Sequence, residues 1–141
     1  MFDEDISPGV AATLVRPGSG QVTASSVHSA ATTAHPAVRF LLDRVDPAMR
    51  SAFHGRCPEV VLLSGIAAEA QASLTADGVH DPGPARILDR MSLLLSGAVI
   101  AGRLLREWGD PVHERPIPPC SSCAPALDAL GVRVVEEVLP A

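Results

Sequence analysis

The sequence predicts an α/β fold, a mixed sheet of four or five strands with helices on its faces, in one domain spanning residues 1–141. Three observations predict it. The chain opens with a β-hairpin pattern, continues with segments whose apolar residues recur at the period of an α-helix, and ends its helical stretches at β-branched segments. With three Phe, one Trp and no Tyr, the core must be mainly aliphatic.

The hairpin follows residues 1–8, which we expect to be a flexible acidic segment. Residues 10–16 are rich in β-branched side chains and end at Pro17-Gly18-Ser19-Gly20, a strong turn signal. Residues 21–27 alternate as a second strand. Because this strand is small and polar on both faces, it either lines a cavity with one face or forms the edge of the sheet.

Three helices are predicted in the middle of the chain. The first begins at Pro36, a residue favoured at the first helical position, and is interrupted at Asp46-Pro47 before one more turn. The second begins at Pro58 and is nearly continuously apolar, as in a buried helix, and the third stops at Ser96-Gly97. Their predicted extents are residues 36–45, 58–72 and 85–95, with a surface loop over residues 75–84.

The C-terminal third is predicted to alternate strand, helix and strand. Residues 98–108 favour a strand over an extension of the preceding helix, because β-branched residues follow a glycine. Several prolines then impose an extended approach to Cys120. Residues 124–130 are predicted as a helix ended by Gly131, and residues 132–138 as the last strand.

The cysteines fall in two short motifs, Cys57-Pro58-Glu59 and Pro119-Cys120-Ser121-Ser122-Cys123, which use all three cysteines of the chain. Three thiolates can hold a zinc ion and leave a fourth position for water. A glutamate two residues after one of the thiolates can move the protons of that water. His-or-Cys-x-Glu followed downstream by Pro-Cys-x-x-Cys is the signature of zinc-dependent deaminases.

The spacing also predicts where these groups lie in the fold. Cys57 and Cys120 are each expected at a helix start, where partial positive charge lowers the pKa of a thiol. Zinc lowers the pKa of bound water towards neutrality. Glu59, on the first turn of its helix, would accept a proton and deliver it to the ring nitrogen and then to the leaving amine of a cytosine-like amidine.

The residues around the two motifs resemble a known family. The runs His54-Gly55-Arg56-Cys57-Pro58-Glu59, His35-Pro36-Ala37-Val38, Pro119-Cys120-Ser121-Ser122-Cys123-Ala124 and Leu130-Gly131-Val132 are similar to those of bacterial YwqJ-type deaminases. These belong to the cytidine deaminase-like superfamily and are related to deaminases of polymorphic toxins. The resemblance covers most of the chain.

The resemblance implies a three-layer α/β/α sandwich in which both motifs start helices beside the sheet. It implies Zn²⁺ as cofactor, with Cys57, Cys120 and Cys123 as ligands and Glu59 as proton shuttle. Two departures concern the substrate: residues 71–96 form an insertion between the motifs, and the chain has no asparagine to hold a sugar. Salvage of nucleotides, modification of another metabolite and a toxin-like role all remain open.

His54 raises the main alternative. With Cys57, Cys120 and Cys123 it would complete a closed, structural zinc site, and Glu59 would then be an ordinary first-turn carboxylate favoured by the helix dipole. The chain would in that case be a catalytically inactive binding or regulatory protein. Thiols without any metal are a further alternative, and a redox pair is a weaker one.

Several residues outside the motifs are candidates for contacting substrate. His54, Ser121 and His28 could face the pocket, as could Ser25 on the second strand. Phe53 and Trp108 are candidate base-stacking surfaces, although packing is the usual role of a lone aromatic residue. Three arginines before the second motif could contact phosphate, although a solvated face is the usual explanation: Arg103, Arg106 and Arg115.

Charge limits the classes of partner. A formal net charge of −5 argues against a general nucleic-acid coat, so a base, nucleoside or nucleotide is the expected substrate. A single-stranded nucleic-acid cytosine deaminase is the alternative. The acidic N-terminus and the lack of an apolar run of about 18 residues predict a cytoplasmic protein without a membrane span. Self-association is expected from the superfamily resemblance.

Overall fold

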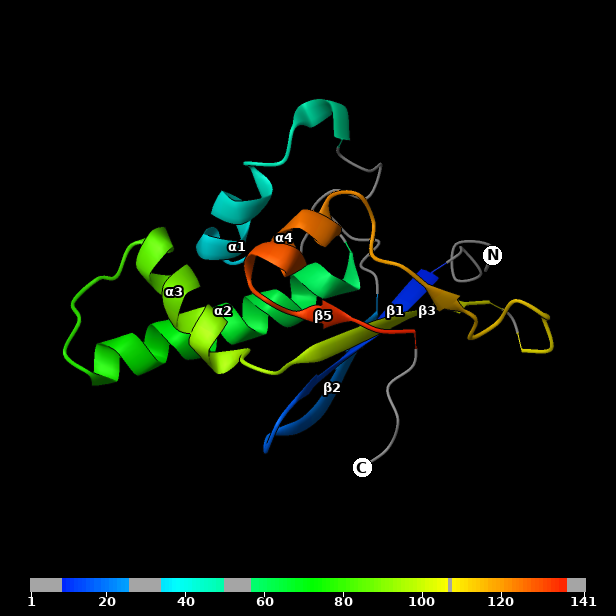
Figure 1. Ribbon diagram of the computed structural model, residues 1–141, viewed down its shortest axis with the longest axis horizontal. Coiled ribbons are helices and arrows are strands. Elements are labelled where there is room, and N and C mark those ends of the chain that lie inside the picture. The colour runs from blue at the N-terminus through cyan, green and yellow to red at the C-terminus, as the bar shows by residue number, and fades with distance from the viewer. Residues whose placement is uncertain (1–8, 26–33, 50–56, 107, 137–141) are drawn as a thin grey trace, which may run out of the picture.

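The computed structural model describes residues 9–25, 34–49, 57–106 and 108–136. Within these ranges the chain forms five strands and four α-helices, which Figure 1 shows in sequence colours. In chain order they are β1 (Gly9–Arg16), β2 (Gly20–Ser25), α1 (Pro36–Leu42), α2 (Pro58–Ala76), α3 (Pro84–Leu94), β3 (Val99–Leu105), β4 (Pro116–Ile117), α4 (Cys123–Ala129) and β5 (Arg133–Val134).

The strands form one mixed sheet in the order β2-β1-β3-β4. β1 pairs antiparallel with both β2 and β3, so that Thr13 lies opposite Thr23 on one side and Ala101 on the other. β4 pairs antiparallel and β5 parallel with β3. Since β1 occupies one edge of β3, the two short strands share its other edge. The predicted hairpin and mixed sheet are confirmed, and β2 is an edge strand.

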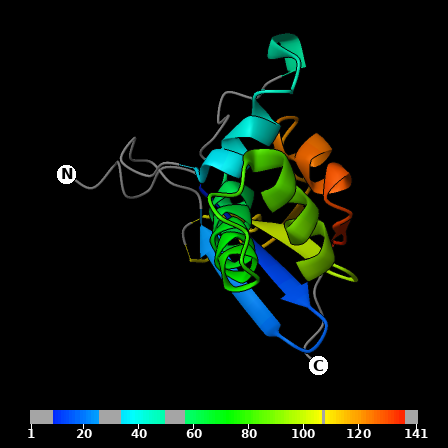
Figure 2. The ribbon, with the colours of Figure 1, turned by 90° about the vertical axis from the view of Figure 1, so that its left-hand side faces the viewer.

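The core lies between the sheet and the helices. On one face of the sheet Ala12, Leu14 and Ile100 are almost fully buried in the cluster that the helices complete. Figure 2 shows the described helices gathered on that side of the sheet. The predicted α/β class is therefore confirmed. Within the described ranges no helix covers the opposite face, where the second helical layer of the implied sandwich would lie; that face carries a polar cavity instead.

α2 is longer than the predicted end near residue 72, because helical hydrogen bonding continues to Ala76 and only Asp77 and Gly78 close the helix. Gly78 has a φ of +87°, a conformation that few other residues adopt. The predicted loop over 75–84 is correspondingly shorter. α3 then packs against α2 and α1, with Ile87 and Met91 buried. Residues 71–96, which were expected to be an insertion, thus form the end of α2 and the whole of α3 in the helical layer.

Other predicted boundaries also shift. The first helix begins at Pro36 as predicted, and a 3₁₀ turn follows at Pro47–Met49. The last strand pairs with β3 only at Arg133–Val134, although its predicted end lies outside the described residues. The proline-rich approach to Cys120 was predicted as extended chain, and part of it pairs as β4. Pro118 and Pro119 lack the backbone N–H that would continue the ladder, so the pairing stops there.

Gly102 lies opposite Ile117 where β3 pairs with β4, and its replacement tests that contact. A Cβ at this position would lie 2.8 Å from the carbonyl oxygen of Ile117, on the strand that leads to Cys120. We expect Gly102→Ala to lower the free energy of unfolding by about 1–3 kcal/mol, because backbone must move to make room. Urea denaturation measures the change.

Gly65 provides the matched control. It lies inside α2, is exposed, and a Cβ there would meet no atom within 4 Å. Gly65→Ala should therefore raise the free energy of unfolding by about 0.5–1 kcal/mol through helix propensity alone. A Gly102→Ala protein as stable as the Gly65→Ala protein would contradict the close packing of β4 on β3.

Candidate metal centre

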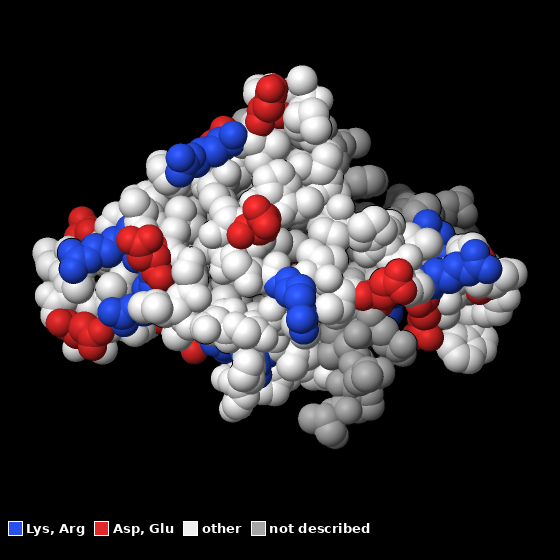
Figure 3. Space-filling view, viewed as in Figure 1, with Lys and Arg blue, Asp and Glu red and all other residues white. Residues whose placement is uncertain are grey.

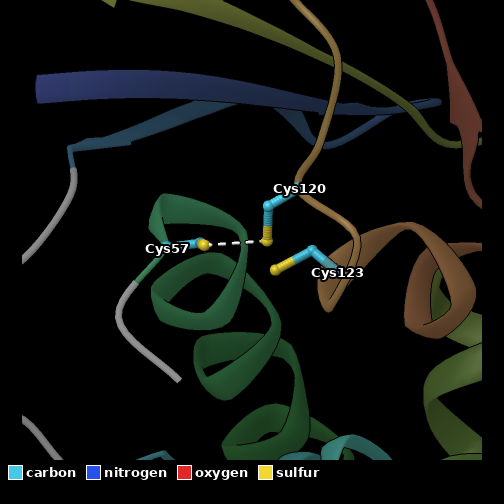
Figure 4. A group of neighbouring side chains, drawn as sticks. All are labelled: Cys57, Cys120 and Cys123. Carbon is cyan, nitrogen blue, oxygen red and sulfur yellow. Dashed lines mark hydrogen bonds between the residues drawn. The ribbon is translucent and has the colours of Figure 1, made fainter. Parts of the chain in front are cut away.

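Three thiols meet at one point beside the sheet. The sulfur atoms of Cys57, Cys120 and Cys123 all lie within 4.8 Å of one another, and the Sγ atoms of Cys57 and Cys120 are 3.1 Å apart. Figure 4 shows the three side chains directed towards one another from the start of α2, the loop before α4 and the start of α4. The cluster brings together residues that are 63 positions apart in the chain.

Local sequence explains how the two backbones approach this point. Cys57 is the N-cap of α2 with an extended backbone, and Pro58 occupies the first helical position, as predicted. The other motif differs slightly: α4 begins at Cys123, so Cys120 precedes the helix. Its carbonyl oxygen still accepts from the backbone N–H of Cys123 at 3.0 Å and of Ala124 at 2.9 Å. The carbonyl group of Cys120 therefore accepts the first hydrogen bonds of α4.

The cluster is built into the core. Cys57 and Cys123 are 6% and 1% exposed and belong to the main buried cluster, whereas Cys120 is partly exposed and packs against it. Ser122, between the two later cysteines, is fully buried. Packing therefore holds the sulfur atoms of Cys57 and Cys123 in place. The partly exposed thiol marks the side from which a ligand can approach.

The pKa of Cys57 is higher than its position at a helix start predicts. A hydrogen bond to Cys120 is the main cause that raises the pKa of Cys57 to about 12, with burial adding to it. The pKa of Cys123 is also raised, first by its hydrogen bond to Cys120 and then by that to Cys57 and by burial. The helix start was expected to lower the pKa of Cys57, and no shift was predicted for Cys123. Without a cation, however, crowding three acidic groups favours their neutral forms.

This donor set fits a metal ion. Thiolates are preferred ligands of zinc, and a cation among the three sulfur atoms would favour their thiolate forms and so lower their pKa values. Three sulfur donors within bonding reach of a common centre match a site with three protein ligands. The three clustered cysteines could thus hold a metal. Binding must displace protons from the thiols, so affinity should increase with pH.

Glu59 lies on the first turn of α2, beside the thiols, and is 4% exposed. Burial is the main cause that raises the pKa of its carboxyl group, while a hydrogen bond from its own backbone N–H works against this shift. The charge of Cys120 raises the pKa further. First-turn carboxylates that serve only the helix dipole usually face water, and Glu59 does not. A buried carboxyl group with a raised pKa beside a metal-binding cluster is typical of a proton-transfer residue.

His35 secures the neighbouring helix. Its Nδ1 accepts from the backbone N–H of Ala37 at 3.0 Å, so His35 is the N-cap of α1. Its backbone N–H donates to the hydroxyl of Ser64 at 3.1 Å, and its Nε2 lies 2.8 Å from Oε1 of Gln71. Neither partner was predicted from the sequence. Ser64 and Gln71 are seven residues apart on α2 and so lie on the same face of the helix. This spacing could have indicated that they share a partner.

Of the remaining site candidates, the structure describes Ser121, Ser25 and Trp108. His54, Phe53 and His28 lie outside the described residues. Ser121 is exposed in the turn between Cys120 and α4, where it stays a candidate. Ser25 is exposed at the end of β2. Trp108 is 91% exposed in the loop between β3 and β4, which in Figure 1 projects away from α2 and α4.

The uncovered face of the sheet has a cavity of about 370 Å³, so β2 both forms an edge and lines a cavity. The hydroxyl groups of Thr13 and Thr23 are 2.9 Å apart within it. Its described lining does not include the cysteines. From the sequence only the strand that forms β2 was a candidate wall, because most of the other lining residues are far from it in the chain. The lining residues are Thr13, Gln21, Thr23, Ala101, Gly102, Arg103, Glu114, Pro116 and Glu136.

Charge is mixed over the face drawn in Figure 3. Acidic and basic side chains alternate at both ends of this face, and its centre carries few of either. Of the three arginines considered for phosphate binding, Arg103 lines the cavity and Arg106 donates to the backbone carbonyls of Leu105 and Gly9. None of the helices in the described part of the chain has both the length and the apolar character that a membrane crossing needs.

Comparison with known proteins gives one family. The family model for YwqJ-like deaminases matches residues 3–132, which include both cysteine motifs and every described helix. Neither the curated proteins nor the solved structures contain a significant match to the chain.

Proposed function

Because the chain belongs to the YwqJ-like deaminase family, we propose that it is a zinc-dependent hydrolytic deaminase. In this proposal it converts a cytosine-like amino group to a carbonyl and releases ammonia. One observation carries it: three cysteine thiols converge beside Glu59, a buried carboxyl group on the helix that Cys57 caps. This combination matches the donor set and the proton carrier that hydrolytic deamination requires.

The three cysteines would hold the zinc ion, and each contributes differently. Cys57 and Cys123 are anchored in the core, so they would set the position of the ion. Cys120 is partly exposed and leaves one side of the cluster open to solvent or substrate. A bound zinc ion would supply the positive charge that makes water acidic near neutral pH.

Glu59 would carry protons during the reaction. Hydrolysis adds water to the carbon that bears the amino group, and the amine must gain a proton before it leaves as ammonia. Burial raises the pKa of Glu59, so its carboxyl group holds a proton more readily than an exposed glutamate does, which suits a group that must both accept and return protons. Glu59 would accept one proton from water and pass it to the ring nitrogen. It would then take the second proton from the hydroxyl group added to the carbon and pass it to the amine, so that ammonia leaves and a carbonyl remains.

We propose a base, nucleoside or nucleotide as the substrate in preference to nucleic acid. The mixed charge of the face in Figure 3 supports this choice, because a phosphate-tracking groove needs clustered arginines. Single-stranded nucleic acid is the alternative substrate of the same reaction. In this proposal the protein is cytoplasmic. Its substrate decides between a role in nucleotide metabolism and a toxin-like role.

Zinc X-ray absorption and ammonia release test the proposal together. With one zinc ion bound, we expect three sulfur neighbours and one oxygen, because the three cysteines are the clustered donors. Ammonia should then be released from cytosine, cytidine or cytidine nucleotides, and a parallel assay for uracil formation should use single-stranded DNA.

Three sulfur neighbours with one imidazole nitrogen would instead mean that His54 closes the site. Such a result, together with no ammonia from any cytosine-containing compound, would contradict the enzyme proposal. The chain would then be a zinc-stabilised binding protein on the deaminase fold.

A further inference from the structure

The sulfur atoms of the candidate metal centre differ in how easily a solute reaches them. Cys57 and Cys123 are 6% and 1% exposed, whereas Cys120 is partly exposed. A small oxidant such as hydrogen peroxide, arriving from solvent, therefore meets the sulfur of Cys120 before the other two. Cysteines that respond to oxidants commonly combine such access with a second thiol close by, which completes a disulfide.

Cys57 supplies that second thiol. Its Sγ lies 3.1 Å from Sγ of Cys120, and Figure 4 shows the two side chains directed towards each other from different elements. The S–S bond of a disulfide is about 2.05 Å long, so the two sulfur atoms would have to approach by only about 1 Å. Cys57 is the N-cap of α2 and Cys120 precedes α4, so neither residue lies within a helix that would have to unwind.

Spacing in the sequence favours a different disulfide. Cys120 and Cys123 form a Cys-x-x-Cys pair, which is the usual spacing of redox-active cysteines. In the structure, however, Cys123 is the first residue of α4, where its backbone N–H donates to the carbonyl oxygen of Cys120, and its side chain is packed in the core. We therefore expect Cys57, whose sulfur already contacts that of Cys120, to form the disulfide ahead of Cys123.

We infer that oxidation joins Cys57 to Cys120, leaves Cys123 reduced, and so releases the metal ion that the three cysteines hold in the reduced chain. This inference rests on the proposed function in taking all three cysteines as metal ligands. Zinc is bound by thiolates, so the disulfide and the bound ion exclude each other. The redox state of the surroundings then decides whether the chain carries its cofactor.

Hydrogen peroxide oxidises the pair in two steps. The sulfur of Cys120 attacks a peroxide oxygen, so that an S–O bond forms, the O–O bond breaks and water leaves a sulfenic acid behind. The sulfur of Cys57 then attacks that of Cys120; the S–S bond forms, the S–O bond breaks, and hydroxide leaves as water with the thiol proton of Cys57. Two thiols lose two electrons, and one peroxide becomes two waters. In the metal-loaded chain both sulfurs start as thiolates, so solvent supplies the two protons.

Tryptic peptides distinguish the possible disulfides. Cleavage after arginine places Cys57 in residues 57–86 and places both Cys120 and Cys123 in residues 107–133, because the one arginine inside the second peptide precedes a proline and resists trypsin. A link between the two peptides therefore requires Cys57, whereas the Cys-x-x-Cys disulfide would stay within the second peptide. Fragmentation of a linked pair identifies which of the two later cysteines carries the link.

The full chain is freed of metal with a chelator, reduced, treated with one equivalent of hydrogen peroxide and then alkylated. We expect the intact mass to fall by two hydrogen atoms before alkylation, and the two peptides to be linked through Cys120 with the alkyl group on Cys123. Dithiothreitol should separate them, because thiol–disulfide exchange reverses the link. In the zinc-loaded chain, a chromogenic chelator should detect one zinc ion released for each disulfide formed.

Cys123→Ala is the matched control, because it removes the cysteine that takes no part in the disulfide. The same peptides should be linked in this variant, whereas Cys57→Ala should give no link; thermal melting shows whether each variant folds, and the wild-type peptide map needs neither. A disulfide within residues 107–133, a sulfinic acid at Cys120 without any link, or a link that leaves zinc bound would overturn the inference. Linked peptides in a chain that binds no zinc would support the disulfide and contradict the proposed function alone.

Discussion

Replacement of Glu59 by Gln should reduce deaminase turnover by on the order of 10²–10⁴-fold while the protein keeps its full complement of zinc. The amide has the same shape and stays buried, but it cannot accept the proton that hydrolysis generates. Metal content by mass spectrometry and ammonia release on the same samples measure the two effects. Full activity in this variant would refute the proton-carrying role.

Glu69→Gln is the control on the same helix. Glu69 is exposed and forms an ion pair with Arg16 at 3.1 Å, so this change alters α2 without approaching the thiols. Turnover should remain at the wild-type level. Loss of activity in both variants would point to damage to α2 rather than to a missing proton carrier.

The Gln variant also has a distinct pH dependence of stability. Burial raises the pKa of Glu59 above that of an unfolded glutamate, so the contribution of this residue to the stability of the metal-free wild type is largest at low pH and is lost as the pH rises through the raised pKa. Glu59→Gln has no ionisation at this position and should lack that loss. Urea denaturation across pH in the presence of a chelator compares the two proteins.

Replacement of Cys120 by Ala should abolish zinc binding and lower the stability of the metal-loaded protein. Cys120 is partly exposed, so its removal disturbs the core less than removal of either buried cysteine. At free zinc roughly a thousandfold above Kd, the lost linkage energy is about 4 kcal/mol. Zinc titration and denaturation with the metal present measure both changes.

A chelator separates the contribution of the bound metal to stability from the contribution of side-chain packing. Without metal, the wild type and Cys120→Ala should differ only by the small cost of one partly exposed thiol. A large difference that persists in chelator would show that the thiols stabilise the fold by packing alone, and equal zinc affinity in both proteins would exclude Cys120 as a ligand.

The sequence by itself determined most of the local structure. Pro36 and Pro58 mark two helix starts because their fixed φ and missing N–H suit the first turn. Gly131, with a φ of +76°, ends α4 as predicted. The cysteine motifs also indicated the family, since their spacing and neighbouring residues are specific. These signals are local, so no knowledge of distant contacts is needed to read them.

Only the tertiary structure decided what those motifs become when they meet. Cys57 and Cys120 are distant in sequence, and packing of α2 and α4 against the sheet brings their sulfurs to 3.1 Å. That contact raises the pKa of Cys57, whereas the helix start alone predicted a lower one. Burial of Glu59 likewise depends on neighbours from other elements. Periodicity reveals which face of an element is buried, but the groups that share a buried site are set by packing between elements.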